Sequence, residues 1–257
     1  LYQKDMRRAP IPAFFENFAG HDRTDFPSPL VRVTGGPGGE AILILGSKKT
    51  ALYDCGMACF EKNLIHNLQT VLDREGKTLD YILLSHTHYD HIGALPYVLK
   101  VWPEAVVCGA KKAKQVFAHP NARATMERLG NQAKELYGIS DVEITAEGLR
   151  VDLVLADGDS LSLGNETVTA YETKGHTDCS MSFLLSPQKI LFASESTGLQ
   201  ATPELINTSP VKSYEDSFAS AERLKNIDVN YLMIPHYGVL PPECNGTFFD
   251  DYRKEAE

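Results

Sequence analysis

The fold and the chemistry of this chain are decided by residues 85–91, which read Ser85-His86-Thr87-His88-Tyr89-Asp90-His91. The stretch follows an apolar, strand-like run at 81–84 and precedes a helix-like segment at 92–101. In an extended loop, residues two apart project to the same side, so His86 and His88 can bind one ion. Asp90 and His91 follow at the turn into the helix, where they can face a second ion nearby. Imidazoles with a carboxylate suit Zn, Fe or Mn.

Three more strand-like runs end in a residue that can bind a metal. These are His176 after 166–173, Glu195 after 189–192 and His236 after 231–234. Any one of them alone fits a structural role. Because α/β proteins bind ligands at the carboxyl ends of their strands, we expect the four segments to supply one centre. Five histidines, one aspartate and one glutamate are enough for two metal ions that share a carboxylate.

Composition limits the class of protein and its partners. The chain has 257 residues, of which 43% are hydrophobic and 23% charged, as in globular proteins. Its 34 acidic and 25 basic residues give a net charge of −9, which repels nucleic acid. No apolar run approaches the roughly 20 residues that span a bilayer. We therefore expect a small-molecule substrate, with neither nucleic acid nor membrane as a partner. Five scattered cysteines fit thiols in a reducing compartment, and hence a cytoplasmic protein.

Strand-like and helix-like segments alternate along the chain, which predicts an α/β protein. We expect strands at 41–45, 50–53, 81–84, 105–108, 151–155, 160–163, 166–173, 182–185, 189–192 and 231–234, and helices at 62–75, 92–101 and 214–224. Residues 111–137 are rich in strong helix formers, and His119 and Pro120 break them into two helices. This helical insert is either an outer layer or a lid over a site.

The order of the motifs resembles that of the metallo-β-lactamase-fold superfamily. The matching motifs are His86-x-His88-x-Asp90-His91, Gly175-His176-Thr177, Glu195 after a strand and the late His236. Asp54 matches an early aspartate that supports the site from behind in that family. The resemblance covers about residues 30–240. It implies an α/β fold of the four-layer αββα type, with two mixed sheets flanked by helices. It also implies a single domain over 1–257 with a helical insert at about 111–138.

The resemblance further implies two divalent metal ions per chain. The implied ligands are His86, His88 and His176 for the first metal, Asp90, His91 and His236 for the second, and Glu195 as a ligand at the bridging position. Zinc is favoured, and iron or manganese fits the same ligands. Most members have an aspartate where Glu195 stands, so the longer side chain must bend or reach from a displaced backbone. True β-lactamases of the family usually have a cysteine there, which argues against β-lactam hydrolysis.

The implied activity is hydrolysis of a small ester, thioester or lactone by a hydroxide that bridges the metals. Asp90 would orient the hydroxide and carry a proton to the leaving group. Tyr237 would donate a hydrogen bond to a developing oxyanion, unless it is only a packed aromatic residue at a strand end. Two other functions stay open. One is a mononuclear iron oxidoreductase that resembles the persulfide dioxygenases; the other is a ligand-sensing regulatory protein with a vestigial site.

Overall fold

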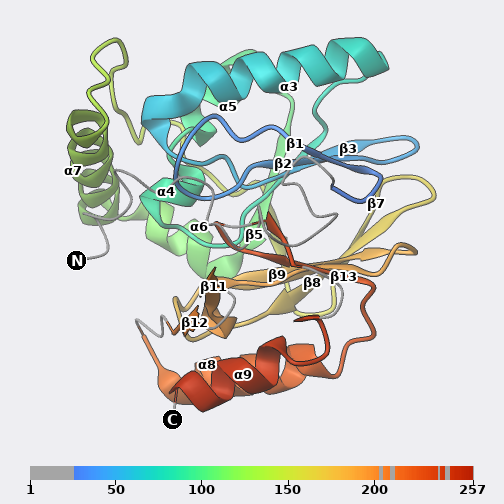
Figure 1. The fold of residues 1–257 in the computed structure, drawn as a ribbon. Coiled ribbons are helices and arrows are strands. Elements are labelled where there is room, and N and C mark those ends of the chain that lie inside the picture. The colour runs from blue at the N-terminus through green and yellow to red at the C-terminus, as the bar shows by residue number, and fades with distance from the viewer. Residues whose placement is uncertain (1–25, 203–204, 209–211, 237, 241–243, 257) are drawn as a thin grey trace. The chain divides into compact units, whose positions relative to one another are not determined.

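The computed structural model describes residues 26–202, 205–208, 212–236, 238–240 and 244–256 of the chain. These residues form two units: Pro29–Leu155 in the first, and Ala156–Glu257 together with residues 26–28 in the second. Each unit has its own six-stranded sheet with helices (Figure 1). No helix within the described part of the chain is both long and apolar enough to cross a bilayer.

The sheet of the first unit brings the carboxyl ends of two neighbouring parallel strands to the same edge. Its strands lie in chain order: β1 (Leu30–Arg32), β2 (Ile42–Leu45), β3 (Thr50–Tyr53), β4 (Tyr81–Leu83), β5 (Val106–Ala110) and β6 (Leu153–Leu155). Strands β1 to β3 are antiparallel, and β3 to β6 are parallel. Tyr53 pairs with Leu83, so the segments that follow β3 and β4 begin at the same edge.

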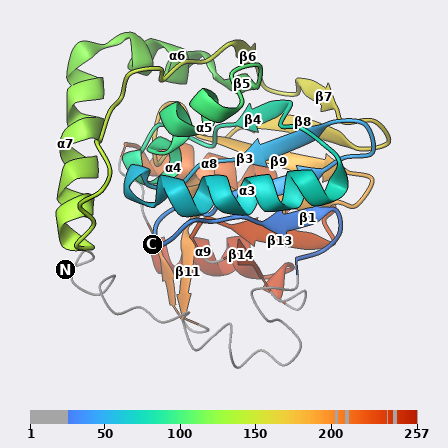
Figure 2. The same ribbon diagram turned by 90° about the horizontal axis from the view of Figure 1, so that it is seen from above.

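The described residues of the first unit form six helical segments. They are η1 (Ala58–Phe60), α3 (Glu61–Glu75), α4 (Tyr89–Ile92), α5 (Leu95–Val101), α6 (Lys111–Ala118) and α7 (Pro120–Leu136). Helix α3 lies over the sheet in Figure 2 and buries a stripe of apolar side chains at the spacing of helical turns: Leu64, Leu68, Val71 and Leu72. Gly76 ends it with a left-handed φ of +59°, which glycine adopts without strain.

Two helix boundaries lie beside a glycine and a proline. The helix predicted over 92–101 is interrupted, because α4 ends at Ile92 and α5 begins at Leu95. A Cβ atom on Gly93 would lie 2.6 Å from the backbone nitrogen of Ala58, so only glycine allows this close approach. The predicted break near His119 is confirmed, since α7 begins at Pro120. Proline suits that position because a first-turn N–H has no partner within the helix.

The sheet of the second unit brings three strand ends to one edge. Its order is β14 (Gly238–Val239), β13 (Tyr231–Ile234), β10 (Ile190–Phe192), β9 (Met181–Ser186), β8 (Thr167–Glu172) and β7 (Ser160–Ser162). Strands β10 and β13 are parallel, whereas β9 is antiparallel to both β8 and β10. The carboxyl ends of β8, β10 and β13 therefore lie at the same edge. A separate hairpin consists of β11 (Leu199–Thr202) and β12 (Leu205–Asn207).

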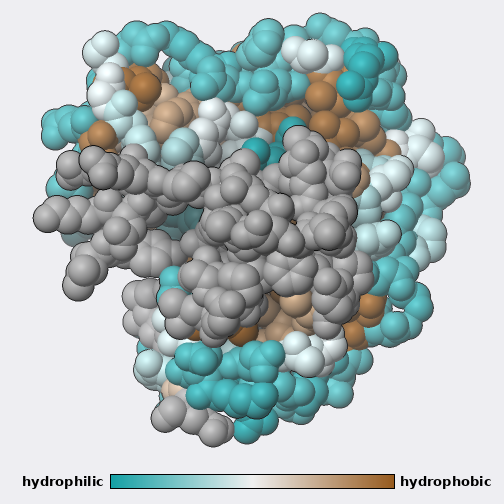
Figure 3. Space-filling view, in the orientation of Figure 1, coloured by the Kyte–Doolittle hydropathy of each residue, from teal (hydrophilic) through white to brown (hydrophobic). Residues whose placement is uncertain are grey.

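Two helices cover one face of this second sheet. Helices α8 (Tyr214–Lys225) and α9 (Phe248–Ala256) lie side by side in Figure 1, and the short helix η2 (Glu195–Thr197) follows β10. The apolar core between sheet and helices consists of Leu191, Ala193, Ile206, Ala221, Leu224, Leu232, Ile234, Leu240, Phe248, Phe249 and Tyr252. The surface over the two helices is largely hydrophilic in Figure 3. The two helices are also joined by an ion pair between Lys225 Nζ and Asp250 Oδ1 at 2.6 Å.

Two mixed sheets with flanking helices confirm the predicted α/β class. The predicted helical insert corresponds to α6 and α7. Whether residues 1–257 behave as a single domain stays a prediction, because the described residues divide into the two units above.

All five cysteines carry thiols, and we expect them to differ in reactivity. Burial raises the pKa of Cys59 to about 11 and that of Cys108 to about 12. Burial, helped by the Asp54 carboxylate, also raises the pKa of Cys55. Since the thiolate is the reactive form, iodoacetamide at pH 8 should label the half-buried Cys244 long before these three. Peptide mapping of native and urea-unfolded protein checks this; rapid native labelling of Cys108 would contradict the buried position.

Candidate metal centre

Asp54 lies directly after β3 and fixes the start of the histidine-rich loop. It is fully buried and has a left-handed φ of +50°. Its backbone nitrogen donates to the Leu83 carbonyl at 3.0 Å. Its Oδ1 atom accepts a hydrogen bond from the backbone nitrogen of Ser85 at 2.8 Å. Asp54 therefore holds the loop at 85–91 from behind, as the family resemblance implies.

The same carboxylate determines which ring nitrogens of two histidines carry hydrogen. The Ser85 hydroxyl donates its only hydrogen to Asp54 Oδ2 at 2.6 Å. Its 2.9 Å contact with Nδ1 of His86 therefore requires that Nδ1 be the donor. Nδ1 of His91 lies 2.8 Å from the same Oδ2, and a carboxylate only accepts. In both neutral imidazoles the lone pair that can bind a metal is then on Nε2.

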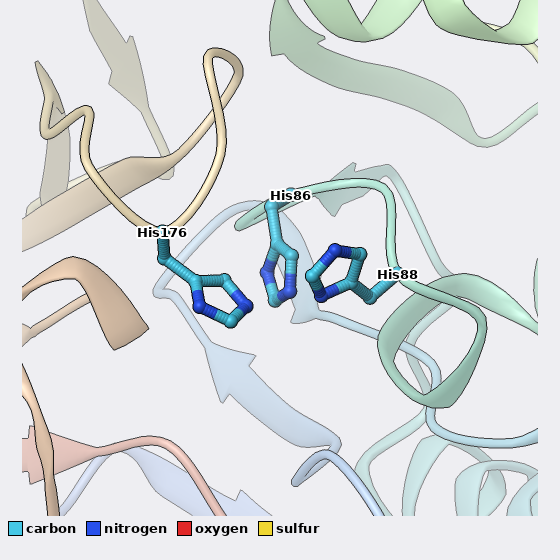
Figure 4. Close-up of side chains that lie close together, drawn as sticks. All are labelled: His86, His88 and His176. Atoms are coloured by element: carbon cyan, nitrogen blue, oxygen red, sulfur yellow. The ribbon is translucent and has the colours of Figure 1, made fainter. Parts of the chain in front are cut away.

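Four metal-ligating side chains gather in the first unit around this support. The ring of His86 lies 4.6 Å from that of His88 and 4.2 Å from that of His91, between centroids. In Figure 4, His86 and His88 extend from the loop between β4 and α4. Asp90 and His91 belong to α4, and Asp90 Oδ2 lies 3.8 Å from His91 Nε2.

Gly39 allows the turn between β1 and β2 to lie against His91. Its backbone nitrogen donates to the Asp90 carbonyl at 2.9 Å. A Cβ atom at this position would lie 2.7 Å from Nδ1 of His91, closer than real side chains approach. A side chain here would therefore compete with the Asp54–His91 hydrogen bond for the same space.

The second unit supplies three further donors from the edge where β8, β10 and β13 end. His176 lies in the loop between β8 and β9, which Figure 4 also shows. Glu195 is the first residue of η2, three residues past the end of β10. His236 follows β13 and has a left-handed φ of +68°, a conformation that is uncommon for a non-glycine residue.

The carboxylate of Glu195 lies between the two imidazoles of this unit. Its Oε1 atom is 2.9 Å from Nε2 of His236, and its Oε2 atom is 3.2 Å from Nε2 of His176. Metal–ligand bonds are about 2.0–2.2 Å long, so two ligand atoms on one ion lie about 2.9–3.6 Å apart. Each oxygen of Glu195 faces a different histidine, as the oxygens of a carboxylate between two ions do. Lys174, a possible alternative partner, pairs instead with Glu172 at 3.2 Å.

The predicted residues thus fall into one set in each unit, except Tyr237, which lies outside the described residues. The sequence did not indicate Gly39 and Ser85, nor Ser196, whose hydroxyl accepts a hydrogen bond from the backbone nitrogen of His176 at 3.0 Å. Ser85 directly precedes the histidine motif and Gly39 lies in the glycine-rich stretch 35–39, so both had a signal in the sequence. Ser196 had none beyond its place next to Glu195.

Comparison with known proteins establishes the family. Residues 34–236 match the family model of the metallo-beta-lactamase superfamily. Because the match covers most of the chain, this protein belongs to the metallo-β-lactamase superfamily. Members of this superfamily are mostly metal-dependent hydrolases, and their fold is associated with the binding of divalent metal ions.

Individual relatives show how broad this family is. The chain is 27% identical over 208 residues to the metallo-β-lactamase fold-containing protein ST1585 of Sulfurisphaera tokodaii, covering 78% of this chain and 73% of that protein. It is 26% identical to rubredoxin-oxygen oxidoreductase of Megalodesulfovibrio gigas (67% and 37% covered) and 25% identical to hydroxyacylglutathione hydrolase of Bartonella henselae (59% and 46%). The chain therefore spans less than half the length of these last two proteins.

The crystal structure of ST1585 resembles the chain with a TM-score of 0.66 at 22% sequence identity. The match covers 88% of this chain and 85% of that one. This likeness shows the fold, and the predicted metallo-β-lactamase-like class is therefore confirmed.

Proposed function

We propose that the chain is a binuclear metal-dependent hydrolase of a small ester, thioester or lactone. By the family resemblance, the donors of the two units would supply His86, His88 and His176 to one ion, Asp90, His91 and His236 to the other, and Glu195 to both. The observation that carries the proposal is the placement of the two Glu195 oxygens, each beside the Nε2 atom of a different histidine.

The chemistry of the donors fits divalent ions. Hydrogen bonds to Ser85 and Asp54 hold Nδ1 of His86 and His91 as donors, so Nε2 is the ligand atom in both rings. Metal-binding histidines are commonly oriented in this way. Two divalent ions bring four positive charges, and the carboxylates of Asp90 and Glu195 offset two of them. A site without thiolates suits zinc, iron or manganese.

Bound ions of this kind lower the pKa of a coordinated water and polarise a carbonyl oxygen. The residues of the chain would then supply positioning and proton transfer. Asp90, whose side chain is only partly buried, would hold the proton released from the water and deliver it to the leaving oxygen or sulfur. Asp54 would keep His91 oriented during this step, because its carboxylate accepts the Nδ1–H bond.

A screen of the zinc-loaded protein tests this activity. The panel should contain a p-nitrophenyl ester, an S-acylglutathione, a γ-lactone and a β-lactam, with chelator-stripped protein as the control. Zinc-dependent turnover of at least one of the first three is expected, because hydroxyacylglutathione hydrolases are among the relatives. Glu195 in place of cysteine predicts no β-lactam turnover. Turnover of none of the three, or equal turnover after stripping, would contradict the proposal.

An oxidoreductase is the second candidate, since rubredoxin-oxygen oxidoreductase is also a relative. It predicts iron in the purified protein and consumption of O₂ with a reduced electron donor. The hydrolase proposal predicts that zinc alone restores activity to the stripped protein. Reconstitution with zinc or with iron, followed by both assays, separates the two candidates.

Ser85→Ala should weaken metal binding without unfolding the protein. The change removes the hydroxyl that orients His86 and leaves the backbone contact with Asp54 in place. Losing such an orienting partner typically costs about 10–100-fold in metal affinity. Zinc titration against a chromophoric chelator measures the effect, with Ser160→Ala as the control because that hydroxyl is exposed on β7. Equal affinity of Ser85→Ala and wild type would contradict the proposed role of Ser85.

A further inference from the structure

Buried hydroxyl groups surround the backbone next to Glu195 in the second unit. Thr173, Ser182, Ser194, Ser196 and Thr197 are each at most 1% exposed. They come from the segments that follow β8 and β10 and from β9 itself. A buried hydroxyl without a hydrogen-bond partner is unfavourable. The hydrogen bonds that satisfy these hydroxyls also restrain the backbone around them.

Ser182 connects the three segments. Its Oγ atom accepts a hydrogen bond from the backbone nitrogen of Ser194 at 2.9 Å, and it lies 3.0 Å from Oγ1 of Thr173. The hydroxyl of Ser194 donates in turn to the Thr173 carbonyl at 3.4 Å. Ser194 immediately precedes Glu195, so Ser182 fixes the point from which the Glu195 side chain starts.

Ser196 connects the two donors more directly. Its Oγ atom accepts a hydrogen bond from the backbone nitrogen of His176 at 3.0 Å. The hydroxyl of Thr197 donates to the Ser194 carbonyl at 2.9 Å and tightens the same turn. The backbone of His176 is therefore tied to the residue that follows Glu195.

We propose that Ser182 and Ser196 are positioning residues, which hold Glu195 and His176 at coordination spacing before a metal binds. The inference rests on the proposed metal centre and concerns how a glutamate serves in it. A glutamate is one methylene longer than an aspartate, so its backbone must be held at a matching distance from the ions. The two hydroxyls supply this constraint, since one fixes the residue before Glu195 and the other the residue after it.

Zinc affinity and thermal unfolding of Ser182→Ala and Ser196→Ala test the proposal. We expect each change to weaken zinc binding by about 10–100-fold, the typical effect of a residue that orients a ligand. Thr50→Val is the matched control, because it removes a buried hydroxyl that donates to the Thr78 carbonyl in the first unit. It should lower the unfolding temperature of the metal-free protein comparably and leave zinc affinity unchanged.

The double variant Glu195→Gln, Ser196→Ala separates positioning from a general structural role. If Ser196 acts through Glu195 and His176, the double variant should lose less zinc-binding free energy than the sum of the losses in Glu195→Gln and in Ser196→Ala. The inference would be overturned if both serine variants bound zinc as the wild type does, or if the losses of zinc-binding free energy in the double variant were additive. It would also be overturned if both serine variants failed to fold without metal. A wild-type chain that binds no zinc would overturn the proposed function as well.

Discussion

Asp90→Asn should lower kcat by about 10²-fold or more, the usual contribution of a general acid–base group. An asparagine keeps the size of the side chain, but it cannot take up a proton and release it to the leaving group. Asp90 belongs to α4 beside His91, with its Oδ2 atom 3.8 Å from His91 Nε2. The variant should fold normally, because Asp90 lies outside the buried core.

The comparison must be made on protein whose metal content has been measured, since Asp90 is also a proposed ligand. Asp73→Asn is the matched control: that carboxylate is exposed on α3, where it accepts a hydrogen bond from Gln69. It should leave kcat unchanged. Near-wild-type turnover of metal-loaded Asp90→Asn would remove the proton-transfer role of Asp90.

Glu195→Gln should weaken binding of at least one metal by more than about 10²-fold, beyond the effect of residues that only orient ligands. An amide has one oxygen acceptor, whereas the carboxylate presents one oxygen to His176 and the other to His236. The substitution also removes one of the two negative charges that offset the ions. Metal content after dialysis against a weak chelator measures the loss.

Glu195→Asp extends this test. Its carboxylate would be withdrawn by roughly one C–C bond, about 1.5 Å, while hydroxyls of Ser182 and Ser196 hold the neighbouring backbone. We therefore expect aspartate to bind metal more weakly than the native glutamate, although most of the family has aspartate here. Full metal retention by Glu195→Gln would show that Glu195 is not a ligand.

Segments with a strong hydrophobic period were predicted almost to the residue. The helix expected at 62–75 is α3 (Glu61–Glu75), because its apolar residues recur at helical spacing and are buried. The strand expected at 231–234 is β13. Strands β11, β12 and β14 were not predicted, since each has two to four residues and owes its conformation to backbone pairing with a partner strand.

The candidate ligands were predictable for a different reason. His86, His88, Asp90 and His91 form a motif that is contiguous in the sequence, and His176, Glu195 and His236 follow strand-like runs. Of the residues that orient them, Asp54 was expected from the family resemblance, whereas Ser182 and Ser196 were not predictable because their roles depend on contacts between distant segments. Ser182 and its partner Ser194 are 12 positions apart, and Ser196 and its partner His176 are 20 apart. Neither serine differs in local sequence from one on an exposed loop.

The metal content of the purified chain tests the central claim most directly. The protein should be loaded with zinc, dialysed against metal-free buffer and analysed by inductively coupled plasma mass spectrometry. The binuclear centre predicts about two zinc ions per chain, and His236→Ala should reduce this to about one, because it removes a ligand from only one of the ions. One ion or none per wild-type chain would contradict the account.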